Sequence, residues 1–73
     1  MGSRENIKEV LKVLIKHKGI TQKEFANAIG VQEAAISKWL SGMQIPQVEL
    51  YDTICDYFKI SLDQLFGRKP LDF

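Results

Sequence analysis

Residues 22–39, QKEFANAIGVQEAAISKW, contain the pattern that decides the fold of this chain. Ala26 lies in an apolar segment, Gly30 follows four residues later, and Ile36 and Trp39 come next at helical spacing. Because glycine adopts positive φ without the steric penalty of a Cβ, Gly30 predicts a tight turn. Two helices joined by a turn of about three or four residues touch closely near the corner, where a small side chain such as that of Ala26 fits. The stretch therefore predicts two short helices that cross at a tight corner.

Apolar residues recur at helical spacing on both sides of this stretch and predict three more helices. We expect helices over about residues 4–17, 22–29, 32–40, 48–58 and 61–66. Their inward faces are expected to carry Ile7, Val10, Leu11, Val13, Leu14 and Ile15; Phe25, Ala26 and Ile29; Ala35, Ile36, Trp39 and Leu40; and Val48, Tyr51, Ile54, Cys55 and Phe58. Strict alternation of apolar and polar residues never persists, so no strand is expected. The predicted fold class is all-α, a compact five-helix domain with a helix-turn-helix formed by its second and third helices.

Two capping boxes mark helix starts. Thr21 with Glu24, and Ser61 with Gln64, have the spacing at which each side chain satisfies the backbone amide of the other residue. Glutamine is a poor cap, so the helices that follow Gln32 and Gln47 should be less stable, by about 1 kcal/mol each, than with a good cap.

Length and charge set further bounds. The 73 residues are expected to form a single domain, 1–73, with a core of about residues 4–66 and a tail of residues 67–73. Ten basic and nine acidic residues give a net charge of +1, which does not by itself favour nucleic acid. No apolar run approaches the length of about 20 residues that spans a bilayer, and no export signal is visible, so no membrane partner and a cytoplasmic location are expected.

The reactive residue types are too few for catalysis. Cys55 is the only cysteine and His17 the only histidine, which excludes an internal disulfide and leaves no ligand set for a metal. Cys55 is expected in the core, and His17 near a helix C-terminus. With no nucleophile–base pair and no phosphate loop, we expect neither an enzyme nor a cofactor.

The third helix has an outer face. Ile36 and Trp39 should attach this helix to the core, and core packing is favoured over base stacking for Trp39. Residues Glu33, Ala34, Ser37 and Lys38 then share the exposed side. Glu33 could also serve only the helix dipole, and Ala34 could be small only because it is exposed.

The chain resembles the phage-repressor and Cro-type helix-turn-helix family. The resemblance covers about residues 7–66 and is carried by GITQKEFA (19–26), GVQEAAISKW (30–39), Gly42 with Pro46, and ISLDQL (60–65). It implies a domain whose third helix enters the major groove of double-stranded DNA. The residues expected at base edges are Gln32, Glu33, Ala34, Ser37 and Lys38. The residues expected at phosphates are Thr21, Gln22, Lys23, Ser41, Gly42 and Gln44, with backbone amides of residues 41–44 offered to the DNA strand.

The sequence departs from the family pattern at two places. Family members often pair an arginine and a glutamate where this chain has Ile15 and Leu40, so we expect these two apolar side chains to touch. The loop after the third helix lacks basic residues, and Lys23 and Lys38 must compensate for Glu33. We therefore expect modest, strongly salt-dependent affinity from a monomer.

The leading hypothesis is a sequence-specific transcriptional regulator, a repressor that binds a two-fold-related operator as a homodimer. The dimer surface is expected to use Leu62, Phe66, Leu71 and Phe73, although these residues could instead only complete the core. The alternative is a protein-interaction module such as the antitoxin of a toxin–antitoxin pair, which the near-neutral charge favours. The two functions are compatible.

Overall fold

Five α-helices and one 3-10 turn follow one another along residues 3–73. The computed structural model describes the backbone of residues 3–73 and the side chains of residues 7–73; the first two residues of the predicted domain lie outside the described residues. The elements are α1 (Ser3–Lys18), α2 (Gln22–Ile29), α3 (Glu33–Ser41), η1 (Val48–Leu50), α4 (Tyr51–Phe58) and α5 (Leu62–Leu65). Residues 3–73 contain no strand, and the predicted all-α class is confirmed. Within this range, no helix combines the length and apolar character needed to cross a membrane.

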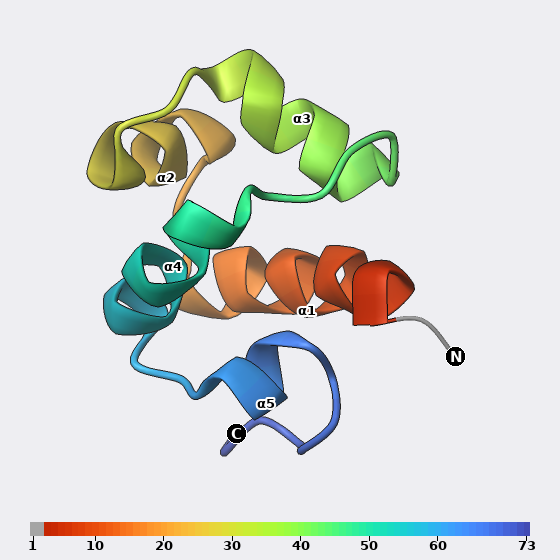
Figure 1. Ribbon diagram of the computed structural model, residues 1–73. Helices are drawn as coiled ribbons and strands as arrows, with labels where there is room; N and C mark the ends of the chain where they lie inside the picture. The colour runs from red at the N-terminus through yellow and green to blue at the C-terminus, as the bar shows by residue number, and fades with distance from the viewer. Residues whose placement is uncertain (1–2) are drawn as a thin grey trace.

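Helix α1 runs through the middle of the molecule and separates its two ends (Figure 1). It packs against α3 on one side and against α5 on the other, while α2 packs against α3 and α4. Helix α3 therefore lies at one outer edge of the molecule, and α5 with the C-terminal tail lies at the opposite edge. This arrangement leaves one side of α3 without a covering helix.

Local signals place the starts of α2 and α5 as expected. The amide of Glu24 donates to Thr21 Oγ1 at 3.0 Å, and the amide of Thr21 donates to the Glu24 carboxylate at 2.8 Å. The second predicted box, between Ser61 and Gln64, is present with distances of 2.9 and 3.1 Å. Gly30 has φ +79° and ends α2 in the left-handed region, where its amide donates to the Ala26 carbonyl. Both capping boxes and the glycine turn are confirmed.

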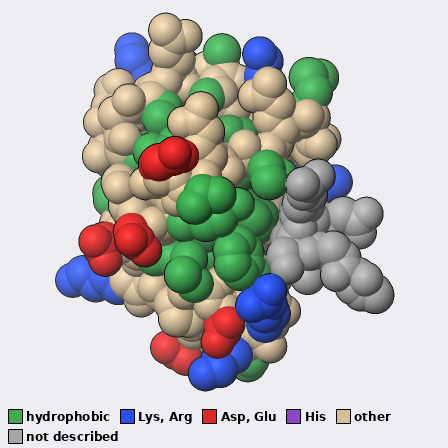
Figure 2. Space-filling view, viewed as in Figure 1, with side chains coloured by type: hydrophobic (Ala, Val, Ile, Leu, Met, Phe, Trp, Pro, Cys, Tyr) green, Lys and Arg blue, Asp and Glu red, His purple; other side chains and the backbone are tan. Residues whose placement is uncertain are grey.

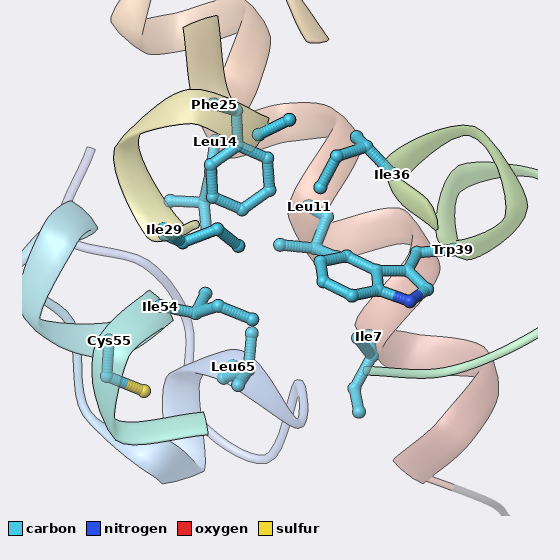
Figure 3. Packing of buried hydrophobic residues seen from close by; sticks show 11 residues of the cluster. Ile7, Leu11, Leu14, Phe25, Ile29, Ile36, Trp39, Ile54, Cys55 and Leu65 are labelled. Atoms are coloured by element: carbon cyan, nitrogen blue, oxygen red, sulfur yellow. The ribbon is translucent and has the colours of Figure 1, made fainter. Parts of the chain in front are cut away.

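All five helices contribute to one apolar core (Figure 3). The buried side chains of this core are those of Ile7, Leu11, Leu14, Phe25, Ala26, Ile29, Ile36, Trp39, Ile54, Cys55 and Leu65, and Pro46 in the loop after α3 is also fully buried. The Trp39 indole is 5% exposed and meets the Phe25 ring edge-on, with ring centroids 6.4 Å apart. The expectation that Trp39 belongs to the core is confirmed. Ile15 and Leu40 are both half-buried against this cluster; their mutual contact stays a prediction.

Two residues predicted to face the core lie outside it. Val48 is 72% exposed because it begins a 3-10 turn, η1, and α4 itself begins only at Tyr51. A 3-10 turn advances by about three residues per turn, so Val48 falls off the apolar stripe that continues through α4. Val13 is 46% exposed. Periodicity along one helix predicts a broad apolar face, but only the neighbouring helices decide how much of that face is covered.

The C-terminal tail folds back onto the helices. The Gln64 side-chain amide donates to the Pro70 carbonyl at 3.1 Å, and Leu71 packs against the core. The Phe73 ring stacks on the His17 imidazole of α1, with centroids 3.7 Å apart and an interplanar angle of 6°. The tail therefore supplies a partly buried side chain, that of Leu71, which covers the core. The bounds of the domain core, about residues 4–66, stay a prediction.

Candidate nucleic-acid interface

The outer side of α3 brings together every residue predicted at a base edge. Glu33, Ala34, Ser37 and Lys38 are all exposed, while Ile36 and Trp39 on the opposite side are buried. Gln32 precedes α3 as its N-cap residue and makes no side-chain capping bond, as its poor capping chemistry predicts. The exposed carboxamide of Gln32 thus adjoins the first turn of the same face.

The start of α2 adjoins this face. Thr21 and Lys23 are exposed, and Gln22 is half-buried. The Ser37 hydroxyl donates to Gln22 Oε1 at 2.9 Å, so the middle of α3 is tied to the first residue of α2. The first amides of a helix have no acceptor within it; the capping box uses that of Glu24, which leaves those of Gln22 and Lys23 at the helix start. Amide donors and a lysine at one helix start suit an anionic ligand.

The loop after α3 corrects one sequence expectation. The amides of Gly42, Met43 and Gln44 all donate to the carbonyls of Lys38 or Trp39, at 3.0 to 3.3 Å. The Ser41 hydroxyl donates to the Lys38 carbonyl at 3.0 Å. Backbone amides of residues 42–44 are therefore not offered to a DNA strand as expected, because the C-terminal cap of α3 already uses them. At this loop the exposed Gln44 side chain remains as a donor.

Lys8 is a candidate contact that the sequence reasoning missed. A Cβ built on Gly42 would lie 3.2 Å from Lys8 Cδ and 3.3 Å from Lys8 Nζ, so the lysine side chain lies directly against this glycine. Both residues line a hollow of about 680 Å³ between α1 and the loop after α3. Its lining is Ile7, Lys8, Trp39, Ser41, Gly42, Met43, Gln44, Ile45 and Gln47. From the sequence alone the charged face of α1 indicates only solvent exposure, because the contact of Lys8 with Gly42 joins segments far apart in the chain.

The charges around α3 are mixed. Lys8, Lys23 and Lys38 supply positive charge, and Glu24 and Glu33 supply negative charge close to the same helix starts. The neighbouring basic residue of α1, Lys12, lies 3.9 Å from the Glu9 carboxylate. A phosphate backbone would therefore meet a few lysines set among acids rather than a uniformly basic surface.

The remaining reactive side chains lie elsewhere. Cys55 is buried on α4, and burial raises the pKa of its thiol, with further contributions from the carboxylates of Asp52 and Asp56. A thiol held in its neutral form is a poor nucleophile. His17 stacks on Phe73, on the side of α1 that faces the tail. Within the described part of the chain, no cluster of His, Cys, Asp and Glu could hold a metal ion.

Two helices that meet at a glycine turn, with the outer side of the second helix exposed, define a helix-turn-helix domain. A helix-turn-helix family model matches residues 7–65, and this chain belongs to that family. The resemblance drawn from the sequence is thereby confirmed.

Two curated proteins are similar over most of this chain. The HTH-type transcriptional activator BcrR of Enterococcus faecalis is 35% identical over 63 residues, which are 86% of this chain and 31% of that protein. The antitoxin PezA of Streptococcus pneumoniae serotype 4 is 33% identical over 61 residues, which are 84% of this chain and 39% of that protein. The chain thus spans between 31% and 39% of the length of these relatives. No solved structure matches it significantly.

Proposed function

We propose that this chain is a sequence-specific regulator that binds double-stranded DNA with α3 in the major groove. The observation that carries the proposal is the outer side of α3, where Glu33, Ala34, Ser37 and Lys38 are exposed while Ile36 and Trp39 attach the helix to the core. The major groove admits an α-helix and presents a distinct pattern of donors and acceptors for each base pair. A helix held from its inner side, with charged, polar and small side chains outward, suits that groove.

The proposed base contacts follow from side-chain chemistry. Gln32 suits adenine, whose N6 donates and N7 accepts, and the Glu33 carboxylate suits the amino group of cytosine. The Ala34 methyl group packs against a thymine methyl, and Lys38 donates to guanine or to a flanking phosphate. Each contact predicts a preference at one base pair.

The proposed phosphate contacts lie at two edges of α3. At the start of α2 they are Thr21, Gln22 and Lys23, whose side chains and free amides suit phosphate oxygens. At the loop after α3 they are the Gln44 side chain and Lys8, where the strand passes Ser41 and Gly42. With few lysines and two nearby glutamates, affinity should be modest and should fall steeply with salt.

A two-fold operator requires a dimer, and we propose a homodimer that uses the α5 end of the molecule. Leu62 and Phe73 are 42% and 57% exposed, while Phe66 and Leu71 are half-buried beside them in the fold. Hydrophobic side chains also gather on the face between α3 and α5 (Figure 2). Two half-sites of such an operator lie about 34 Å apart, one turn of DNA, and this is the spacing that the dimer must give its recognition helices. Sedimentation velocity at micromolar concentration should reveal the dimer, and a clean monomer would remove it for this chain.

The test of DNA binding is a titration of labelled random-sequence duplex at low salt, followed by competition with unlabelled nonspecific duplex. Specific binding predicts a fraction of the pool that resists competition, and affinity that falls linearly with the logarithm of salt concentration. A Glu33→Ala, Lys38→Ala double variant should lose the resistant fraction while its helical circular dichroism stays unchanged. No binding to any duplex at low salt would overturn the proposal.

A reporter assay, rather than the fold, distinguishes repression from activation. The sequence favours a repressor, whereas one similar protein is named a transcriptional activator. A promoter carrying the selected site should lose output when this chain is expressed if it represses, and gain output if it activates. As a regulator of this kind, the protein would act in the cytoplasm.

The second candidate function is that of an antitoxin, which the similarity to PezA favours. An antitoxin needs a protein partner surface besides any DNA face, and the exposed apolar residues at the α5 end are the candidate. Binding to a protein partner without affinity for any duplex would favour this function over the first. Binding to both a protein partner and a DNA duplex would support both functions.

A further inference from the structure

One hydrogen bond joins the two halves of the proposed interface. The Ser37 hydroxyl donates to Gln22 Oε1 at 2.9 Å, although the two residues are 15 positions apart in the sequence. Ser37 is exposed and Gln22 half-buried, so the bond lies at the surface rather than in the core. The close packing of α2 on α3 is already held by Phe25, Ala26 and Ile36, which are 0 to 1% exposed. The bond is therefore not needed to hold the two helices together.

The direction of this bond limits what Ser37 can do for a base. A serine hydroxyl has one proton, and here that proton is given to Gln22. Guanine N7 and O6 and thymine O4 are acceptors, so Ser37 has no proton to offer them. Of the groups in the major groove, only the amino groups of adenine and cytosine could still donate to it. Ser37 is thus limited to accepting a hydrogen bond from these two amino groups.

The same bond orients Gln22. A carboxamide has one acceptor side and one donor side, and occupying Oε1 fixes which side faces Ser37. Nε2 is the other terminal atom of this carboxamide, and it belongs to the first residue of α2, where the backbone amides of Gln22 and Lys23 also lack helical acceptors. A phosphate oxygen at this helix start would meet several N–H donors on one residue pair.

We propose that Ser37 is a positioning residue that orients the Gln22 carboxamide toward a DNA phosphate, and not a reader of bases. The inference rests on the proposed DNA-binding function. It moves Ser37 from the base-edge set, where the sequence placed it, to the phosphate set. Base recognition is left to Gln32, Glu33, Ala34 and Lys38.

A phosphate contact and a base contact predict different measurements. Phosphates carry no sequence information, so loss of Ser37 should weaken a selected duplex and an unrelated duplex of the same length by the same factor. Loss of one hydrogen-bonded contact corresponds to about a three- to tenfold change in affinity. Because serine and glutamine are uncharged, the slope of affinity against salt should not change.

The experiment measures fluorescence anisotropy with both duplexes at three salt concentrations. The variants are Ser37→Ala, Gln22→Ala and their combination, with Ser37→Thr to retain the hydroxyl and Thr53→Ala on α4 as the control for loss of an exposed hydroxyl. We expect equal losses from the two single alanine variants, no further loss in the double variant, and recovery with Ser37→Thr. The control should bind as the original chain does.

A measurement without DNA tests the orienting bond itself. The side-chain amide resonances of Gln22 in the free protein should shift in Ser37→Ala and return in Ser37→Thr. Unshifted resonances would overturn the proposal, as would additive losses in the double variant. A Ser37→Ala variant that changes preference at one base pair but binds the unrelated duplex normally would show that Ser37 reads a base. Failure of the original chain to bind either duplex would instead overturn the proposed function.

Discussion

The two helices of the helix-turn-helix begin in opposite ways. Helix α2 starts with a complete capping box between Thr21 and Glu24, and its first residue, Gln22, is held by Ser37. Helix α3 starts after Gln32, which makes no side-chain capping bond, and its first residue is the acidic Glu33. The side chains at the start of α2 are hydrogen-bonded within the protein, whereas Gln32 before α3 makes no side-chain capping bond.

This contrast separates two tasks. A side chain fixed in advance loses little freedom when it meets a phosphate, which lies at the same place in every duplex. A side chain that reads a base is more useful when its donors and acceptors are not already satisfied within the protein. The contrast therefore assigns sequence-independent contact to the start of α2 and base reading to the start of α3.

The largest expected effect comes from removing the buried side chain of α3 that packs against α2. Trp39→Ala deletes an indole that is 5% exposed and packs against Phe25. We expect a loss of about 3–5 kcal/mol in the free energy of unfolding, because the cavity left behind cannot fully close. Urea denaturation measures this loss, with the exposed neighbour Lys38→Ala as the control that should stay within about 0.5 kcal/mol. A Trp39→Ala protein as stable as the original would mean that α3 is not held from its inner side.

A charge at Leu40, a half-buried position of α3, should have the next largest effect. Leu40 and Ile15 are both half-buried against the core, where the family pattern has an ion pair. Leu40→Glu puts an unpaired carboxylate there, and we expect a loss of about 2 kcal/mol, while the volume-conserving Leu40→Met costs less than about 1.5 kcal/mol. Thermal unfolding followed by circular dichroism compares the two. Equal midpoints for Leu40→Glu and the original chain would contradict the expected contact with Ile15.

The sequence predicted those features that depend on neighbouring residues. The capping boxes and the turn at Gly30 follow from residues within one helical turn of each other, and the structure has each of them. The prediction that Val48 and Val13 face the core was wrong, because the exposure of a side chain depends on which elements cover it. The Ser37–Gln22 bond and the contact of Lys8 with Gly42 join segments far apart in the chain, so no local pattern indicates them. The sequence also did not predict that the amides of residues 42–44 are hydrogen-bonded within the protein. The family pattern indicates where a DNA strand passes, but not which backbone donors the C-terminal cap of α3 already uses.

Paired substitutions at the two helix starts test the contrast directly. Thr21→Ala removes the capping hydroxyl of α2 and should cost about 1 kcal/mol of stability. Gln32→Ser supplies the missing cap of α3 and should stabilise the fold by a similar amount, about 1 kcal/mol at most. The same Gln32→Ser protein should lose preference at one base pair in a DNA titration. If it gained stability and kept its base preference, Gln32 would not be a reader.

Substitution of Lys8 should have the smallest effect on stability and a clear effect on the salt dependence of DNA binding. Lys8→Ala should leave stability within about 0.5 kcal/mol, because the side chain lies at the surface of the hollow beside Gly42. The slope of log affinity against log salt should fall by about 0.9, the value for one phosphate contact. Lys69→Ala removes the same charge from the tail, at the end of the molecule away from α3, and should not change the slope. Identical slopes for both variants would remove Lys8 from the interface.

The most direct test of the central claim is selection of bound sequences from a random duplex pool by the original chain and by Glu33→Ala in parallel. Because base reading is assigned to the start of α3, the original chain should enrich a defined sequence arranged as an inverted repeat, with half-sites about 34 Å apart. The Glu33→Ala protein should enrich the same sequence with its preference relaxed at one position in each half-site. A pool that shows no enrichment at low salt, or an enriched sequence with equal preference at every position for both proteins, would contradict this account.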